Sequence, residues 1–181
     1  NKFELSQLKI NLNSFLNQQI YIKDIYRVND EVHARFSAIS REYEYYISLA
    51  KDVFSYKTSH FIHQDLNIEK MNQAISIIKD YENFEAFSKS KTDVKTYLCN
   101  IIACSLIEKE NILIFRIKAN RFLRNMVRAI VGTILEVGLE KIPPEEIHSI
   151  IKSKDRSKAG LSMPPHALFL TKIEYPCNIK S

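Results

Sequence analysis

Two runs of apolar and β-branched residues, 97–107 and 111–118, are separated by only three charged residues. This spacing is typical of an antiparallel hairpin, because a parallel pair of strands needs a crossover of a dozen or more residues. The chain therefore has to contain an antiparallel sheet and elements that cover it. Its 181 residues, 45% of them hydrophobic, suffice for one compact core built without disulfides.

Two periodicities divide the rest of the chain. Apolar residues that recur every three or four positions predict helices over residues 4–17, 67–81, 122–137 and 143–151. Asn67 is expected to cap the second of these helices and Gly138 to end the third. Alternating apolar residues predict further strands over 20–28, 42–49 and 168–175. Because hairpins and not single crossovers join the longer strands, we expect an α+β fold with a mixed, mainly antiparallel sheet backed by helices.

Charge and composition narrow the classes of function. Basic residues outnumber acidic ones by 26 to 21, and the net charge of +5 favours a polyanionic partner. With three glycines and neither GxGxxG nor a P-loop motif, no nucleotide cofactor is expected. The sequence has no run of about 18 apolar residues and no signal peptide pattern, and its cysteines, Cys99, Cys104 and Cys177, are odd in number and outside any CxxC pair. These features predict a cytoplasmic protein with reduced thiols.

The histidines do not predict a metal site. His60 and His63 stand three positions apart, without a cysteine or an acidic cluster at ligand spacing, so no metal is expected. His33, His148 and His166 are isolated and are interpreted as residues held by local hydrogen bonds. No GxSxG or comparable nucleophile motif is present either.

Three arginines, Arg121, Arg124 and Arg128, lie three and four positions apart and would project from one side of a helix. Arg116 and Lys118 precede them, and no acidic residue lies between positions 116 and 128. Repulsion between like charges in such a row favours an external anion, for which phosphate is the natural candidate. The alternative is a solvated helix face whose arginines pair with distant acids.

A second cluster interleaves cations with aromatic rings. Its members are Arg35, Phe36, Arg41, Tyr43, Tyr45 and Tyr46. Rings that stack on bases, beside guanidiniums that hold phosphates, are typical of RNA-binding surfaces. Alternating tyrosines in a strand are nevertheless more often explained by half-buried packing within the sheet.

The stretch VHARFSAISREYEY (32–45) resembles the bacterial tRNA pseudouridine synthase A family, in which a His-Ala-Arg-Phe-Ser-Ala run leads into an Arg-x-Tyr-x-Tyr strand. Further stretches similar to that family follow along the chain: FEAF (84–87), IKANRFLRNMVRAIVGTILEVG (117–138), KDRSKAG (154–160) and PPHALFLTKIEYP (164–176). Nearly the whole chain is covered. Several motifs in the family's order are far more specific than any one of them alone.

The resemblance implies an enzyme that isomerises uridine to pseudouridine in the anticodon stem-loop of tRNA, around positions 38 to 40. It implies no cofactor and no metal, tRNA as the partner, a homodimer and a cytoplasmic location. It also implies a pseudouridine synthase fold of two α/β halves. Residues 1–31 would then be a remnant of the N-terminal half, and residues 32–181 would form the C-terminal domain.

The family's nucleophile is an aspartate in a Gly-Arg-Thr-Asp-x-Gly-Val-His motif, and that motif is absent from this sequence. The nearest stretch, KTDV (91–94), contains Asp93 but lacks the arginine, the glycine and the histidine. We therefore expect a C-terminal part of the enzyme that lacks the nucleophile and is inactive alone. The alternatives are a non-catalytic RNA-binding module and a purely structural domain. The structural domain predicts that Tyr43 and Arg128 are buried with no cleft between them.

The resemblance also assigns roles to single residues. Tyr43 matches the tyrosine that contacts the target uridine, Arg128 the arginine that pairs with the nucleophilic aspartate, and Leu168 an apolar residue near the uracil. Two departures from the family pattern are Val32 in place of Phe and Ala167 in place of Gly. Candidate contacts to the RNA backbone are Arg35, Arg41, Lys118, Arg121 and Arg124.

Overall fold

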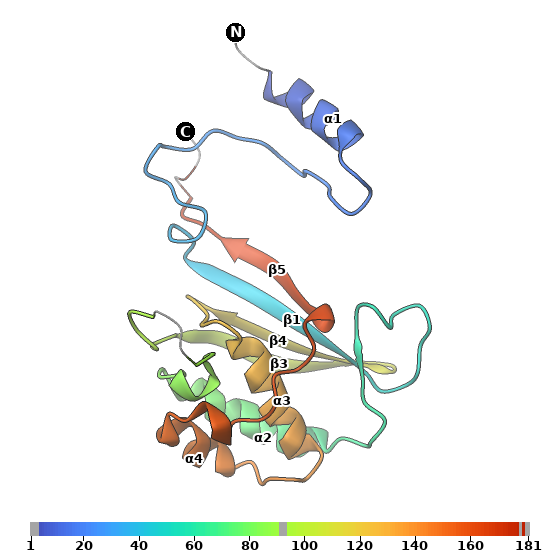
Figure 1. The fold of residues 1–181 in the computed structure, drawn as a ribbon, viewed down its shortest axis with the longest axis vertical. Coiled ribbons are helices and arrows are strands. Elements are labelled where there is room, and N and C mark those ends of the chain that lie inside the picture. The colour runs from blue at the N-terminus through green and yellow to red at the C-terminus, as the bar shows by residue number, and fades with distance from the viewer. Residues whose placement is uncertain (1–3, 91–93, 178, 180–181) are drawn as a thin grey trace. The chain divides into compact units, whose positions relative to one another are not determined.

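The computed structural model describes residues 4–90, 94–177 and 179, and the chain divides into two compact units. One unit comprises residues 1–38 together with 175–181, and the other comprises residues 39–174. Among the described residues there are four α-helices and five strands (Figure 1). No helix of the described chain combines the length and the apolar character that crossing a bilayer requires.

The first unit contains one helix, α1 (Leu5–Phe15), which confirms the helix predicted over 4–17. The strand predicted over 20–28 is wrong, because these residues form no strand. The side chain of Asn13 accepts a hydrogen bond from the backbone N–H of Ile22 at 2.8 Å and donates one to its carbonyl oxygen at 3.0 Å. Alternating polarity therefore did not suffice for a strand here, and the backbone of Ile22 bonds a side chain instead.

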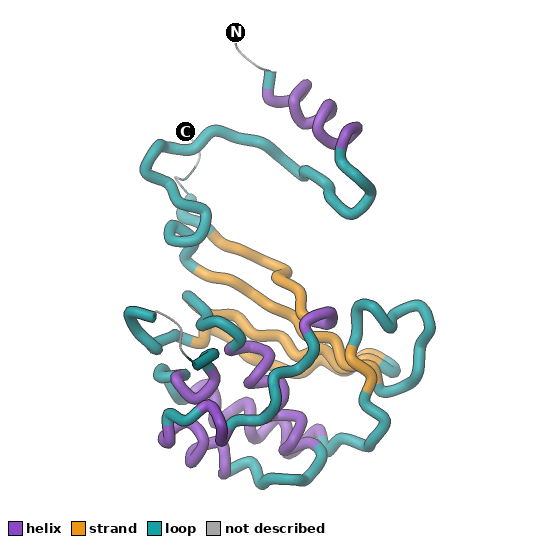
Figure 2. The backbone as a smooth tube through the Cα atoms, in the orientation of Figure 1, coloured by secondary structure: helices purple, strands orange, loops and turns teal. Residues whose placement is uncertain are grey.

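The second unit is built on one mixed sheet with the order β2-β1-β4-β3, in which β5 also pairs with β1. The strands are β1 (Ser40–Ser48), β2 (His60–Phe61), β3 (Ile101–Lys109), β4 (Ile112–Ala119) and β5 (Leu168–Glu174). All pairs are antiparallel except the short pair of β1 with β2. The chain between β1 and β2 is a long loop (Figure 2). The predicted α+β class and the predicted hairpin of β3 with β4 are confirmed.

Three helices lie on one face of this sheet: α2 (Ile68–Lys79), α3 (Met126–Gly138) and α4 (Glu146–Ser153) (Figure 1). The Asn67 side chain accepts a hydrogen bond from the Lys70 N–H at 3.0 Å, which confirms the predicted cap of α2. The core lies between the helices and the sheet. Its largest fully buried side chains include Tyr45, Phe115 and Ile130.

The start of α3 differs from the prediction. The apolar pattern predicted a helix from Phe122, whereas the helix begins at Met126. Asn125, directly before it, has a φ of 71°, and a residue in this left-handed region cannot continue an α-helix on its N-terminal side. Gly138 is the last residue of α3, close to the predicted stop.

The cysteines agree with the prediction of unpaired thiols. Cys99 and Cys104 are buried and Cys177 is exposed, all of them free. Burial raises the pKa of the Cys104 thiol to about 12, so this sulfur stays protonated at neutral pH.

Candidate functional site

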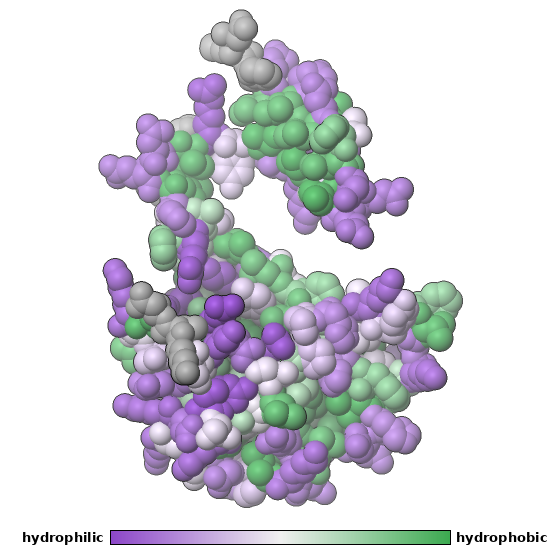
Figure 3. Space-filling model, in the orientation of Figure 1, coloured by the Kyte–Doolittle hydropathy of each residue, from purple (hydrophilic) through white to green (hydrophobic). Residues whose placement is uncertain are grey.

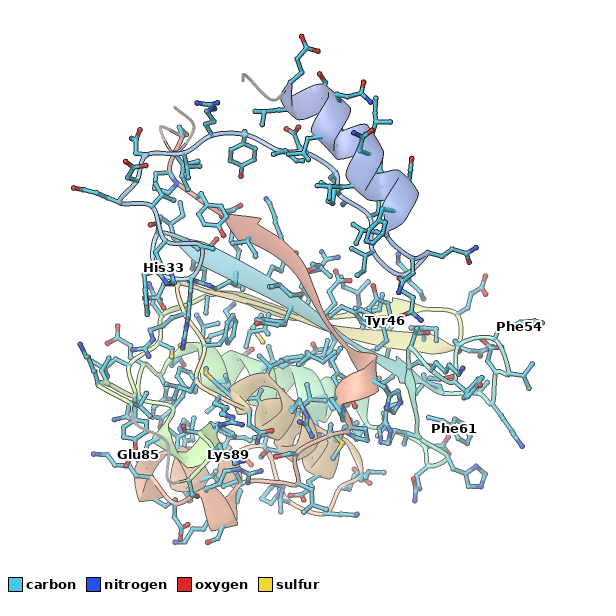
Figure 4. All side chains as sticks on the ribbon, turned by 45° about the horizontal axis from the view of Figure 1, so that its top comes forward. His33, Tyr46, Phe54, Phe61, Glu85 and Lys89 are labelled. Atoms are coloured by element: carbon cyan, nitrogen blue, oxygen red, sulfur yellow. The ribbon has the colours of Figure 1, made fainter. Side chains whose placement is uncertain are left out.

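A pocket of about 690 Å³ opens in the second unit, between one end of β1 and the segment that leads into α3. Its lining comes from β1, from the chain after the 3-10 turn Glu85–Phe87, from the start of α3 and from the chain before β5. Lys89, labelled in Figure 4, and Ser90 are the lining residues that follow the 3-10 turn. The full lining is Tyr43, Lys89, Ser90, Phe122, Leu123, Arg124, Asn125, Met126, Val127, Arg128, Arg156, Ser162 and Leu168.

Part of the pocket lining is aromatic and apolar. The ring of Tyr43 meets the ring of Phe122 edge to face, with centroids 5.1 Å apart and an interplanar angle of 90°. Leu168, the first residue of β5, lines the same pocket. Ala167, which precedes it in the chain, is fully buried. These side chains can contact the face of a flat ring.

Another part of the lining is cationic. Arg128 lies in the first turn of α3, and its Nε donates a hydrogen bond to the carbonyl oxygen of Met163. Lys89, Arg124 and Arg156 also line the pocket, and none of the described lining residues is an aspartate or a glutamate. Burial lowers the pKa of Arg156, and the charge of Glu136 offsets part of that effect. The pocket therefore favours an anion beside a planar ring.

Tyr43, Arg128, Leu168 and Arg124 thus lie around one pocket, and the other predicted RNA contacts do not line it. Arg121 donates to the carbonyl oxygen of Thr96 at 3.2 Å, and Arg41 donates to that of Asn120 at 2.8 Å. Because α3 begins only at Met126, Arg121 and Arg124 do not form a helical stripe with Arg128.

Lys118 lies on the sheet face opposite the helices and forms an ion pair of 2.7 Å with Glu174. On the same face Arg116 pairs with Glu44 at 2.6 Å. The two basic residues that precede the arginine row therefore pair with distant acids, as the alternative interpretation of that row expected. Arg35 belongs to the first unit, where its guanidinium lies 5.5 Å from the centroid of the Phe36 ring.

The tyrosines of β1 divide between the two faces of the sheet. Tyr45 is fully buried and donates to the carbonyl oxygen of Pro164 at 3.0 Å, and burial raises its pKa. Tyr46 donates to Glu44 at 2.6 Å on the face that the helices do not cover. The packing interpretation of the aromatic cluster is therefore right for Tyr45, and Tyr43 is the strand tyrosine that reaches the pocket.

The histidines that the sequence left isolated all have hydrogen-bond partners. His33 Nδ1 accepts from the N–H of Arg35, His148 pairs with the hydroxyl of Tyr81, and His166 pairs with the carbonyl oxygen of Ser59. In the described parts of the chain no group of three or more His, Cys, Asp or Glu is arranged to hold a metal ion. Asp93 lies outside the described residues.

Several pocket residues were not predicted: Lys89, Ser90, Asn125, Arg156 and Ser162. Arg156 lies inside the KDRSKAG stretch, one of those that carry the resemblance. The sequence therefore drew attention to Arg156 but assigned it no role. Ser162 and Asn125 carry no comparable signal. They meet only because the chain after α4 returns to the start of α3.

Comparisons with known proteins show which family the sequence resembles. A family model described as tRNA pseudouridine synthase matches residues 81–176. The chain is 46% identical over 165 residues to the tRNA pseudouridine synthase A of Parabacteroides distasonis, covering 91% of this chain and 66% of that protein. It is 46% identical over 169 residues to that of Bacteroides fragilis, covering 93% and 67%, and 38% identical over 176 residues to that of a Thermoanaerobacter species, covering 96% and 72%. The chain belongs to the tRNA pseudouridine synthase family.

The chain spans about two thirds of the length of the curated relatives that it matches. The alternative of a purely structural domain predicted no cleft between Tyr43 and Arg128, whereas both residues line one pocket.

Proposed function

We propose that this chain carries the uridine-binding part of a tRNA pseudouridine synthase that acts on the anticodon stem-loop, around positions 38 to 40. The observation that supports the proposal is the convergence of Tyr43, Arg128 and Leu168, from three distant parts of the chain, on one pocket. The family resemblance assigns these three residues to the target nucleotide and its nucleophile. The cations in the lining of the same pocket suit the phosphates that flank a flipped nucleotide.

The reaction rearranges bonds without gain or loss of atoms. The bond between N1 of uracil and C1′ of the ribose breaks, the base turns, and C5 bonds to C1′. The proton on C5 leaves, and N1 takes up a proton. The edge-to-face pair of Tyr43 with Phe122, together with Leu168, would hold the base while it turns. Arg128 would keep an approaching carboxylate ionised through its opposite charge.

We propose that the nucleophilic carboxylate comes from a segment outside this sequence, so that the chain alone forms no pseudouridine. Two observations support this. The sequence lacks the family's aspartate motif, and the described pocket lining contains no carboxylate.

Tritium release from stem-loops labelled at C5 of uridine tests the proposal, because replacement of the C5 proton frees the label. The chain should release none, whereas the full-length product of the gene that encodes it should release tritium from uridines at positions 38, 39 or 40. A stem-loop whose only uridine lies outside these positions is the matched control. Release by the chain alone would show that it contains its own nucleophile. Failure of the full-length product would favour the non-catalytic RNA-binding module.

Arg128→Ala in the full-length product should abolish most turnover and leave the affinity for the stem-loop within several-fold. The reason is that one cation among several contributes a small share of RNA binding. Equal losses of turnover and affinity would assign Arg128 to the binding surface instead.

The homodimer and the cytoplasmic location that the resemblance implies stay predictions. Sedimentation equilibrium of the full-length product tests the first, and cell fractionation tests the second. A monomer at micromolar concentration, or recovery in the membrane fraction, would contradict them.

A further inference from the structure

The chain between α4 and β5 lies directly on the backbone of α3. A Cβ added at Gly160 would come within 2.7 Å of the backbone nitrogen of Thr133, and one added at Gly132 would overlap the carbonyl oxygen of Leu161. The Gly160 N–H also donates to Oγ1 of Thr133 at 2.9 Å. Only glycine permits so close an approach, so residues 159–163 are held in a fixed position against the helix.

Within this segment, the hydroxyl of Ser162 accepts two hydrogen bonds. Asn125 Nδ2 donates to Ser162 Oγ at 2.5 Å, and Arg156 Nη2 donates to it at 2.8 Å. Amide and guanidinium nitrogens can only donate, and a hydroxyl has two acceptor lone pairs and one proton. Both lone pairs of Ser162 are therefore used, and its O–H can only donate to a further group. No acceptor for that proton is found among the described residues.

Both donors are fixed by their own surroundings. Arg156 also donates through Nη1 to the carbonyl oxygen of Ala159 at 3.1 Å, so its guanidinium links Ala159 to Ser162. Asn125 has the left-handed backbone that precedes α3. The two donors therefore determine which direction remains for the Ser162 proton.

Ser162 is half-buried and lines the pocket, together with Lys89, Arg124 and Arg128. Because the described lining contains cations and no carboxylate, a bound anion is the acceptor that this pocket favours for the Ser162 proton. The neighbouring cations favour an anionic acceptor over a neutral one.

We propose that Ser162 donates a hydrogen bond to a backbone phosphate oxygen of the RNA bound in this pocket, and that Asn125 and Arg156 act as positioning residues for that hydroxyl. The proposal rests on the proposed function for the identity of the polymer as RNA. A carbonyl oxygen of uracil is the other acceptor that RNA could present, and the experiment separates the two.

The first measurement is the affinity of this chain and its variants for an anticodon stem-loop. Ser162→Ala should weaken binding about tenfold, as expected for a lost hydrogen bond to a charged group, while Ser162→Thr keeps the hydroxyl and should stay within about twofold of the native chain. Asn125→Asp should weaken binding at least as much as Ser162→Ala, because a carboxylate would accept the Ser162 proton itself. Matching thermal unfolding midpoints confirm that the variants are folded.

The second measurement uses stem-loops that carry one neutral methylphosphonate each. At one position the methylphosphonate should weaken binding of the native chain about tenfold. The same methylphosphonate should hardly affect binding of Ser162→Ala, because that variant already lacks the hydrogen bond that the methylphosphonate removes. The effect of Ser162→Ala could instead depend on the base and not on any phosphate. It would then disappear only with a stem-loop whose target nucleotide is abasic, and the proposed bond to a phosphate would be wrong. Binding that is unchanged in Ser162→Ala would overturn this proposal alone. A native chain that does not bind the stem-loop would contradict the proposed function as well.

Discussion

The helices α1 and α3 are of similar length, 11 and 13 residues, but they differ completely in burial. Nearly every residue of α3 is buried in the second unit, whereas α1 has no buried residue. Ile10 and Phe15 of α1 are 59% and 86% exposed, and Figure 3 shows hydrophobic side chains gathered over the segment that carries α1. Both sequences have helical periodicity. The comparison shows that periodicity predicts the helix, while the stability of the helix depends on what covers its apolar side.

The largest expected effect is the loss of unfolding free energy when a buried side chain of α3 is shortened, compared with the same change in α1. Ile130→Ala removes a fully buried side chain from α3 and should lower the free energy of unfolding by about 2–5 kcal/mol. Ile10→Ala in α1 should change it by less than about 0.5 kcal/mol, since Ile10 is largely exposed. Urea unfolding followed by circular dichroism measures both. Similar losses in the two variants would mean that α1 is packed as firmly as α3.

Gly160→Ala tests how tightly the second unit is assembled. The added methyl group would collide with the backbone of α3, so we expect a loss of about 1–3 kcal/mol in the free energy of unfolding. The variant should also lose affinity for the stem-loop, because the collision displaces residues 159–163. Unchanged stability would show that this segment can move away from α3 at no cost.

Helix caps provide a smaller contrast between the two units. Asn67 caps α2 through its side chain, whereas Glu4, at the corresponding position before α1, makes no such bond. Asn67→Ala should therefore cost about 1 kcal/mol of unfolding free energy, and Glu4→Ala should cost almost nothing. Thermal unfolding of the two variants side by side checks this difference. A comparable cost at Glu4 would point to a capping contact at α1.

The smallest expected effect is a change in how the stability of the fold depends on acidic pH. Hydrogen bonds from Lys118, Lys172 and Ser40 lower the pKa of Glu174 to about 2, below the value of about 4.3 for a free glutamate. A depressed pKa in the folded state stabilises the fold above pH 4.3, and the contribution is lost as the pH falls toward 2. Glu174→Gln should flatten this part of the stability profile between about pH 5 and pH 2. A profile identical to that of the native chain would show that the carboxylate contributes nothing.

The sequence correctly predicted the helices and strands whose apolar residues pack against another element of the fold. The strand β1, the hairpin of β3 with β4 and the capped helix α2 formed where expected, because their apolar faces meet each other. The alternation over 20–28 pairs with none of the five strands of the described chain and produced only an isolated bridge at Val28. The early end of the helical pattern before Met126 depends on the left-handed backbone of Asn125, which no periodicity reveals.

The site was predictable only in part, for the same reason. Family motifs pointed to Tyr43, Arg128 and Leu168, and these residues do share a pocket. Ser162 was missed because its role depends on a contact between distant segments. That contact is permitted by Gly132 and Gly160, which the sequence reveals only as small residues.

The pairing of β1 with β5 sets Tyr45 opposite Leu168 and thereby joins an early strand to a late one. During synthesis on the ribosome, Tyr43 emerges long before the strand that completes the wall beside it. The pocket lining cannot be complete in a nascent chain until Leu168 has left the exit tunnel, and contacts between such distant positions form slowly. A translation product that stops before Leu168 would retain much of the hydrophobic core but lack the part of the pocket wall that Leu168 forms. The arrangement therefore makes completion of the pocket a late event in the life of the molecule, delayed until nearly all of the second unit has been made.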